Sequence, residues 1–269
     1  MILGIDVSSY QPNVDYNLLY SKGVRFVIIK ATQGTYLRDK TIDSHFQAAQ
    51  KAGMMIGFYH WHDPSKWDAS QADYYLSTVE QYKYHFTCLD VEQFWSDWST
   101  WPRSPQVGFT PNRISESART IANRLKEQTA RPVVIYTRPT FIMDYASPML
   151  EWINDFPVWY ATYPFKAGGE SLSWEEFALR LPDPTRTGPF FPTRFPAIKR
   201  TWLFWQFTGD KFTLPGCASA LDVNYFNGDL PALHKFCGVV PEEEVQPALT
   251  VEQRLSRLEN LVTSHGWSL

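Results

Sequence analysis

Short apolar runs alternate along the chain with longer segments in which apolar residues recur every three or four positions. Residues 2–7 (ILGIDV) and 25–31 (RFVIIKA) are short and rich in β-branched residues, which predicts strands. Between them, residues 16–22 have helical spacing that ends at Gly23. This order predicts a βα unit, in which two parallel strands are joined by a helix.

The same order repeats up to about residue 230. Further strands are expected at 54–60, 86–91, 132–136, 158–161 and 202–207, and helices at 39–53, 70–84 and 110–129. Seven or eight strands of this kind favour an α/β fold in which a parallel sheet closes into a barrel near residues 222–226. In such a barrel the active site lies at the C-terminal ends of the strands.

Two regions depart from this repeat. Residues 165–200 are rich in proline and have no clear period, which predicts a long loop or lid. Residues 239–250 form a Pro- and Glu-rich segment typical of a linker, so we expect the catalytic barrel to occupy residues 1–238.

Residues 251–269 are expected to form a short C-terminal helix. Val251, Leu255, Leu258 and Val262 follow the spacing of a heptad seam. About two heptads are marginal alone, so this helix should dock on the barrel, pair with a second copy or begin an oligomerisation stalk. A homo-oligomer formed through this helix is therefore one of the expectations.

Composition narrows the class of protein. The 269 residues carry a formal net charge of −3 without a basic stripe, which argues against nucleic acid as a partner. No apolar run is long enough to cross a membrane. The first residues enter a strand without the features of a signal peptide. The three cysteines have no metal-binding spacing. Cys217 and Cys237 could pair, but free thiols are the expectation.

Aromatic residues make up 16% of the chain, and this fraction has two interpretations. The rings could fill a large core, or they could line a groove that stacks on sugar faces. Several of them stand at predicted strand ends, together with charged residues, which favours the groove.

Asp90 and Glu92 end the predicted strand at 86–91. Residues i and i+2 of a strand face the same side, with Cα atoms about 6.5–7 Å apart. Two carboxylates in each other's field have their pKa values pushed apart, so that one can stay protonated and act as an acid. Glycosidic cleavage needs such an acid beside an ionised partner. The alternative is a pair of exposed surface acids, as most Asp-x-Glu pairs are.

Asp6 and Asp222 stand at two further predicted barrel positions. Each alone could cap a loop. Together with Asp90 and Glu92 they could form a catalytic cluster, or a metal site. The histidines lack metal-binding spacing, so a metal site is the weaker interpretation and no cofactor is expected.

The chain resembles glycoside hydrolase family 25, the Chalaropsis-type lysozymes that include many phage endolysins. The resemblance covers residues 2 to about 230 and rests on nine segments in order. They are GIDVSSYQ (4–11), FVIIKATQG (26–34), AG followed by GFYH (52–60), QA (71–72), LDVE (89–92), VIYT (134–137), WYATY (159–163), WQF (205–207) and DVNYF (222–226).

The resemblance implies an irregular (β/α) TIM-like barrel that cleaves the β-1,4 bond between N-acetylmuramic acid and N-acetylglucosamine in peptidoglycan glycan strands. Glu92 matches the proton donor, Asp90 its ionised partner, and Asp6 and Asp222 the remaining acids of the subsite. Retention through a substrate-assisted intermediate is implied, although direct attack by a carboxylate is an alternative. The residues expected to bind substrate are Tyr59, Tyr136, Tyr163, Trp205, Gln206, Gln33 and Lys30.

The chain departs from the family pattern at several positions. The family usually has Glu where Gln33 stands, so the pH optimum is expected to differ. Trp95, Trp98 and Trp101 follow the acidic pair and either extend the groove or pack a loop.

Three functional hypotheses follow from these residues. An active muramidase made in a host cytoplasm as a phage lysin, or carried on a virion, is favoured. A weakly active wall-binding module of a phage particle is the alternative. An amidase or peptidase lacks the zinc-ligand spacing or Cys/His pair that its chemistry would need.

Overall fold

A closed barrel forms the centre of the computed structural model, which describes residues 1–92, 109–166, 168–188, 190–192 and 201–239. Within these residues eight strands pair in the order β1–β11–β9–β7–β6–β5–β4–β2, and a β1–β2 pairing closes the ring. The barrel strands are β1 (Ile2–Val7), β2 (Val24–Gln33), β4 (Met55–Trp61), β5 (Phe86–Asp90), β6 (Val133–Thr137), β7 (Val158–Ala161), β9 (Phe204–Gln206) and β11 (Asp222–Phe226).

The barrel is mixed, because β11 runs antiparallel to both of its neighbours, β1 and β9. All other barrel pairings are parallel. The barrel thus closes with a strand at residues 222–226, as predicted. This strand runs antiparallel to its neighbours, whereas a parallel sheet was expected. Asp222 opens β11 and still reaches the catalytic end of the barrel, since it pairs with Asp6 near the end of β1.

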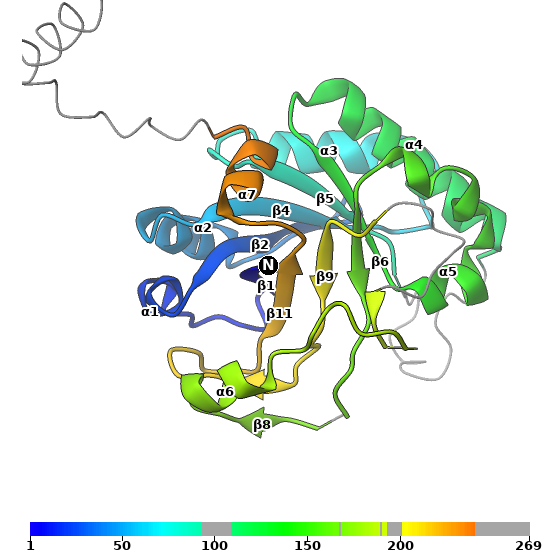
Figure 1. Cartoon of the computed structure of the whole chain (residues 1–269). Helices are drawn as coiled ribbons and strands as arrows, with labels where there is room; N and C mark the ends of the chain where they lie inside the picture. Colours follow the sequence, from blue (N-terminus) through cyan, green and yellow to red (C-terminus); the bar gives the residue numbers. More distant parts are fainter. Residues whose placement is uncertain (93–108, 167, 189, 193–200, 240–269) are drawn as a thin grey trace, which may run out of the picture.

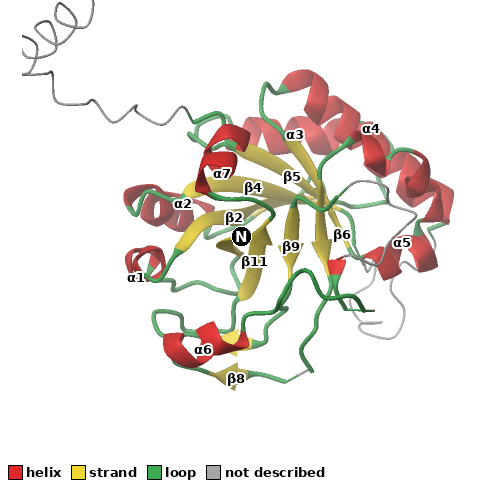
Figure 2. Cartoon of the chain, in the orientation of Figure 1, coloured by secondary structure: helices red, strands yellow, loops and turns green. Residues whose placement is uncertain are grey.

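The helices lie around the outside of the barrel (Figures 1 and 2). They are α1 (Tyr16–Ser21), α2 (Ile42–Lys51), α3 (Ser70–Val79), α4 (Pro111–Gln128), α5 (Pro139–Tyr145), α6 (Trp174–Arg180) and α7 (Leu230–Phe236), with 3-10 turns at Ser147–Glu151 and Ile153–Asp155. Helix α4 shows why such segments are helical: Thr110 accepts a hydrogen bond from the Arg113 N–H at its start, and one face carries buried Ile114, Ile121 and Leu125. None of the helices that the structure describes is long and apolar enough to cross a membrane.

Two apolar layers follow from the alternation of side chains along each strand. Outward residues such as Val27, Ile29 and Ile135 pack under the helices. Inward residues fill the barrel, and Phe86 stacks on Phe204 with ring centroids 5.3 Å apart. Helix α7 closes this end, because its Phe236 ring contacts both of these rings. The opposite end is left for polar side chains.

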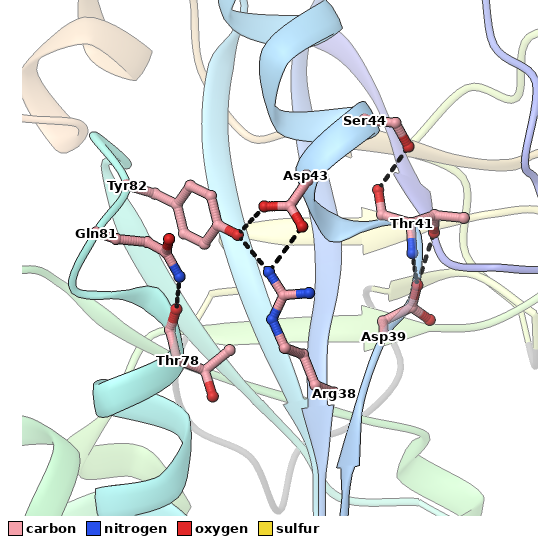
Figure 3. Close-up of polar contacts among 8 residues, drawn as sticks. All are labelled: Arg38, Asp39, Thr41, Asp43, Ser44, Thr78, Gln81 and Tyr82. Atoms are coloured by element: carbon pink, nitrogen blue, oxygen red, sulfur yellow. Dashed lines mark hydrogen bonds and ion pairs between the residues drawn. The ribbon is translucent and has the colours of Figure 1, made fainter.

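Short strands and polar contacts fix the loops that follow β2. Strand β3 (Leu37–Arg38) pairs with the end of β2. Figure 3 shows the Arg38 guanidinium and the Tyr82 hydroxyl both bonded to the Asp43 carboxylate at the start of α2. In the same view the Asp39 carboxylate accepts hydrogen bonds from Thr41. These contacts place Asp39 firmly beside the mouth of the barrel.

The expectation of a structureless loop at 165–200 is wrong for its described part. It contains β8 (Glu170–Ser171), which pairs with β10 (Phe212–Thr213), and helix α6. The helix begins with a capping box in which Ser173 and Glu176 exchange hydrogen bonds. Its Trp174 and Phe177 side chains are buried against the outer core. The predicted linker after Val239 and the helix at 251–269 lie outside the described residues.

Candidate active site

A pocket with a volume of about 200 Å³ opens at the C-terminal ends of the parallel strands. Its wall combines acidic, aromatic and amide side chains from β1, β2, β4, β5, β6, β7, β9 and β11 and from the loops after them. The lining includes Asp6, Tyr10, Lys30, Tyr59, Trp61, Asp90, Glu92, Tyr136, Trp159, Tyr163, Gln206, Asp210 and Asp222.

Asp90 and Glu92 both line this pocket, as their i and i+2 positions predicted. Asp90 is the last residue of β5 and is 4% exposed, and within the described residues its Oδ1 has no hydrogen-bond partner. Burial is the main cause that raises the pKa of both carboxyl groups. The Arg138 guanidinium opposes the rise at Glu92 most, whereas the Lys30 ammonium opposes it most at Asp90. The two acids therefore lie near different cations, although burial favours the neutral form of both and raises the pKa of Asp90 well above its ordinary value.

Asp6 is held by a network of amides. Its Oδ1 accepts hydrogen bonds from Gln206 Nε2 at 2.9 Å and from Asn224 Nδ2 at 2.7 Å. The amide oxygens point away from Asp6, because Gln206 accepts from the Tyr136 and Tyr163 hydroxyls and Asn224 accepts from the Trp159 indole. Burial raises the pKa of Asp6 to about 7, and these two amide donors limit the rise. Asp6 therefore changes its charge near neutral pH.

Asp222 faces Asp6 across the β1–β11 pairing. Its Oδ1 accepts a hydrogen bond of 2.7 Å from the backbone N–H of Asp210. Asp210 has a φ of 48°, an unusual value for a residue with a side chain, and its own carboxylate lines the pocket. Burial raises the pKa of Asp222, and the charges of Asp6 and Asp210 raise it further.

The aromatic wall consists of Tyr59, Trp61, Tyr136, Trp159 and Tyr163, with Tyr10 exposed at the rim. The Tyr136 and Trp159 rings meet edge to face, with centroids 4.5 Å apart. Tyr59, Tyr136 and Tyr163 lie where a sugar-facing role would place them. Rings of this kind offer apolar faces beside polar edges, which suits the faces of a pyranose ring.

Two predicted substrate-binding residues lie elsewhere. The prediction that the Trp205 ring faces sugar is wrong: the side chain is fully buried in the outer core, and its indole N–H donates to Thr162. Adjacent residues of a strand point to opposite sides, so Trp205 and Gln206 cannot both face the pocket. Gln33 lies behind the pocket wall and contacts Lys30 rather than the cavity.

Trp61, Trp159, Asn224 and Asp210 were not among the predicted site residues. Alternation identifies three of them. Trp61 follows Tyr59 by two positions, Asn224 follows Asp222 by two, and Trp159 precedes inward-facing Ala161 by two. Asp210 has no such signal, since it lies in a turn. Trp95, Trp98 and Trp101 lie outside the described residues.

A metal-binding arrangement is not formed here: within the residues that the structure describes, no three His, Cys, Asp or Glu side chains are grouped so as to hold an ion. The three cysteines are free thiols, as expected, and Cys88 and Cys237 are buried.

The comparisons with known proteins agree with this geometry. The profile of glycosyl hydrolases family 25 matches residues 5–216, which is more than half of the chain. The chain belongs to glycosyl hydrolases family 25. The match ends before Asp222, whose place in the site comes from its pairing with Asp6.

Named relatives cover parts of the chain. The autolytic lysozyme of Clostridium acetobutylicum is 31% identical over 60% of this chain and 44% of its own length. The N,O-diacetylmuramidase of Arthroderma benhamiae is 30% identical over 51% of this chain and 58% of its own. The chain thus spans about half the length of these two relatives. The muramidase of Trichobolus zukalii superposes with a TM-score of 0.65 at 26% identity, covering 88% of this chain and 99% of that one.

Proposed function

We propose that this protein is a muramidase, which hydrolyses the β-1,4 bond between N-acetylmuramic acid and N-acetylglucosamine in peptidoglycan. The observation that carries the proposal is the pair Asp90 and Glu92 at the end of β5, facing one pocket walled with aromatic rings. The family and the two curated relatives, a lysozyme and a diacetylmuramidase by name, support the same substrate.

Glu92 is proposed as the general acid. Its pKa is raised by burial, so the carboxyl group keeps its proton to higher pH than an exposed glutamate would. It would give this proton to the glycosidic oxygen as the bond to C1 breaks. The leaving sugar then departs as an alcohol rather than as an alkoxide.

Asp90 is proposed as the ionised partner that acts on the substrate's acetamido group. Its Oδ1 has no hydrogen-bond partner among the described residues and could accept the N–H of that group. The acetamido oxygen would attack C1, and the positive charge of the resulting ring would be balanced by Asp90. Water then attacks C1 and displaces the acetamido oxygen, while the Glu92 carboxylate takes a proton from the water, so the configuration at C1 is retained. Direct attack on C1 by a carboxylate is the competing route.

The experiment is incubation of the protein with purified cell walls, followed by assay of new reducing ends. We expect reducing ends from the native chain and a loss of about 2–4 orders of magnitude in rate for Glu92→Gln, because general acid catalysis contributes on that scale. Gln47→Glu, on helix α2, is the control for a charge change away from the pocket.

Two outcomes would contradict the proposal. Folded native protein that binds walls without producing reducing ends would point to the wall-binding module. Free amines without reducing ends would point to cleavage of the stem peptide.

We also propose that the chain acts as a phage lysin, made in a host cytoplasm, or as a virion-associated muramidase. The support is its fold, which it shares with the catalytic domain of endolysin ply40 from bacteriophage P40 of Listeria monocytogenes at 22% identity. Bacteria that express the chain should lyse only once their membrane is permeabilised. Lysis without permeabilisation would contradict a lysin that depends on a separate membrane opening.

A further inference from the structure

Lys30 is a buried cation whose direct partners are uncharged. The side chain points into the barrel mouth from β2 and is 5% exposed. Its Nζ donates a hydrogen bond of 3.1 Å to Gln33 Oε1 and lies 4.1 Å from the centroid of the Trp61 ring. No carboxylate among the described residues lies within ion-pair distance of this ammonium group. Its positive charge therefore has no ion-pair partner among these residues. Burial lowers the pKa of the ammonium group, and nearby carboxylates, Asp90 first, oppose that fall.

The Gln33 amide is locked in one orientation. The side chain is 6% exposed, and its Oε1 faces Lys30 because an ammonium group can only donate. Its Nε2 donates to the Tyr36 hydroxyl at 3.3 Å, which uses the other end of the amide. The Tyr36 ring in turn rests against Gly34, where a side chain would collide with it. This chain of contacts holds Lys30 at a set position.

Two buried carboxylates, Asp39 and Asp90, feel the charge of Lys30 most strongly, and they differ in their own partners. The oxygens of Asp39 accept hydrogen bonds from the Ser9 N–H, the Thr41 N–H and the Thr41 hydroxyl, two of which appear in Figure 3. Asp90 Oδ1 accepts none within the described part of the chain. The charge of Asp90 is thus compensated by cations with which it forms no ion pair in the described part of the chain, Lys30 first and Arg138 second. The charge of Asp39 is compensated by direct hydrogen bonds.

We propose that Lys30 is a positioning residue that keeps Asp90 ionised, and that the neutral Gln33 amide leaves the charge of Lys30 available to Asp90. A carboxylate at position 33 would pair with Lys30 directly and take up that charge. In a buried, low-dielectric site the loss would weigh more than it would in water. This inference rests on the proposed role of Asp90 as the ionised partner.

Other charged or titratable groups face the same pair from every neighbouring element. They are Asp6 on β1, Asp39 after β3, Tyr59 and His60 on β4, Glu92 after β5, and Arg138 after β6. Burial lowers the pKa of His60 to about 4 and raises that of Tyr59, so both stay neutral between pH 5 and pH 8 by these directions. Asp6, with a pKa of about 7, titrates in every variant alike.

The first experiment is the pH dependence of kcat/KM on soluble peptidoglycan fragments. Added negative charge at position 33, or loss of positive charge at position 30, raises the pKa of Asp90 and moves the acidic limb to higher pH. For Gln33→Glu we expect the acidic limb of the kcat/KM profile to move up by about one pH unit, so that kcat/KM falls about tenfold at pH values below the limb. For Lys30→Met we expect the limb to move by at least the same amount. Lys30→Arg should retain the native limb.

Two matched variants separate charge from contact. Gln33→Met removes the hydrogen bond to Lys30 without adding charge, and should move the limb less than Gln33→Glu does. In a Lys30→Met background, Gln33→Glu should add little, because the charge through which it acts is gone. Equal movement for Gln33→Met and Gln33→Glu, or full additivity in the double variant, would overturn the proposal.

A second measurement is independent of turnover. The Asp90 carboxyl carbon is titrated by NMR in Glu92→Gln protein, with and without Gln33→Glu. A higher Asp90 pKa with Gln33→Glu supports the inference even if the native protein cleaves no wall, in which case only the proposed function fails. If the pKa of Asp90 stays the same in a folded Gln33→Glu variant, the inference about Lys30 is wrong, but the proposed function is not contradicted.

Discussion

At the scale of single residues, Asp6 is a carboxyl group placed where burial favours its neutral form. The side chain is 7% exposed, and burial lifts its pKa from an ordinary value of 3.8 to about 7. Among the described residues, the two amide donors Gln206 and Asn224 favour its charged form directly. A charge held in this way costs folding free energy, so stability should depend on pH through this group.

The variant Asp6→Asn should test that dependence. Because the folded pKa of Asp6 is raised, its contribution to stability is complete below pH 3.8 and is lost as pH rises through about 7. Asparagine stays neutral, so the variant should gain stability over the native protein as pH rises from about 4 to 7. The gap between the two pKa values corresponds to at most about 4 kcal/mol. Urea unfolding at pH 4 and pH 8 measures it, and an equal difference at both pH values would contradict this account.

Trp205 makes a second prediction at this scale. Its indole N–H donates to Thr162 inside the outer core, away from the pocket. Trp205→Phe should lower the free energy of unfolding by about 1–3 kcal/mol, because it leaves a buried acceptor without its donor. The KM for wall fragments should stay at the native value. Trp159→Phe is the matched variant, because the Trp159 indole N–H donates to the Asn224 amide that holds Asp6. This variant should lower kcat. A raised KM for Trp205→Phe would indicate that the Trp205 ring contacts the substrate.

At the scale of elements, glycines permit the close packing of the barrel. Gly57 on β4 has no room for a side chain, because a Cβ there would lie 2.3 Å from the Phe86 ring. That ring stacks on Phe204 and cannot withdraw without disturbing the inner layer. The packing of the inner layer thus depends on close contact between the backbone at Gly57 and the Phe86 ring.

Gly57→Ala should therefore destabilise the protein by about 1–3 kcal/mol, as overpacking of a filled core does. Gly169→Ala is the control, because a Cβ at that position meets nothing within 4 Å. Chemical unfolding of the two variants compares them under the same conditions. Equal stability of the two would show that the barrel interior can repack.

The sequence pattern predicted most elements but not all of their geometry. The bounds of β1 and β7 were predicted correctly, because β-branched and apolar residues mark both ends of each run. Helix α6 was missed although Ser173 and Glu176 have capping-box spacing, since the surrounding prolines dominate that region. The direction of β11 could not be predicted, because alternation has the same period in either direction.

The sequence predicted some residues of the candidate site correctly and misplaced or missed others. Acids at strand ends share a face when the spacing is two, which placed Asp90 and Glu92 correctly. Trp205 was misplaced because a resemblance across a motif does not state which neighbour points inward. Asp210 could not be predicted, since its backbone N–H reaches Asp222 through a turn with no periodic signal. The supporting partners of Asp6 lie 200 and 218 positions away in sequence.

At the scale of the whole molecule, closure of the barrel depends on its last strand. Strand β11 pairs with β1 on one side and β9 on the other. A chain that stops at Gly216 lacks β11 and exposes both of these strand edges, which favours aggregation over folding.

Such a truncated chain should lose the near-ultraviolet circular dichroism of packed aromatic rings and should bind no wall fragments. A chain that ends at Val239, which keeps β11 and α7, is the control and should fold. A native-like spectrum from the shorter chain would show that the other strands form a stable sheet alone.

The pairing of β1 with β11 also has a consequence for synthesis on the ribosome. Asp6 is made 200 residues before Gln206 and 218 residues before Asn224, the two residues whose amides hold it. A nascent chain therefore carries its carboxylates without the arrangement that would let them act. Hydrolytic competence would be gained in one late step, after translation has passed β11, and interrupted translation products would be harmless to the wall.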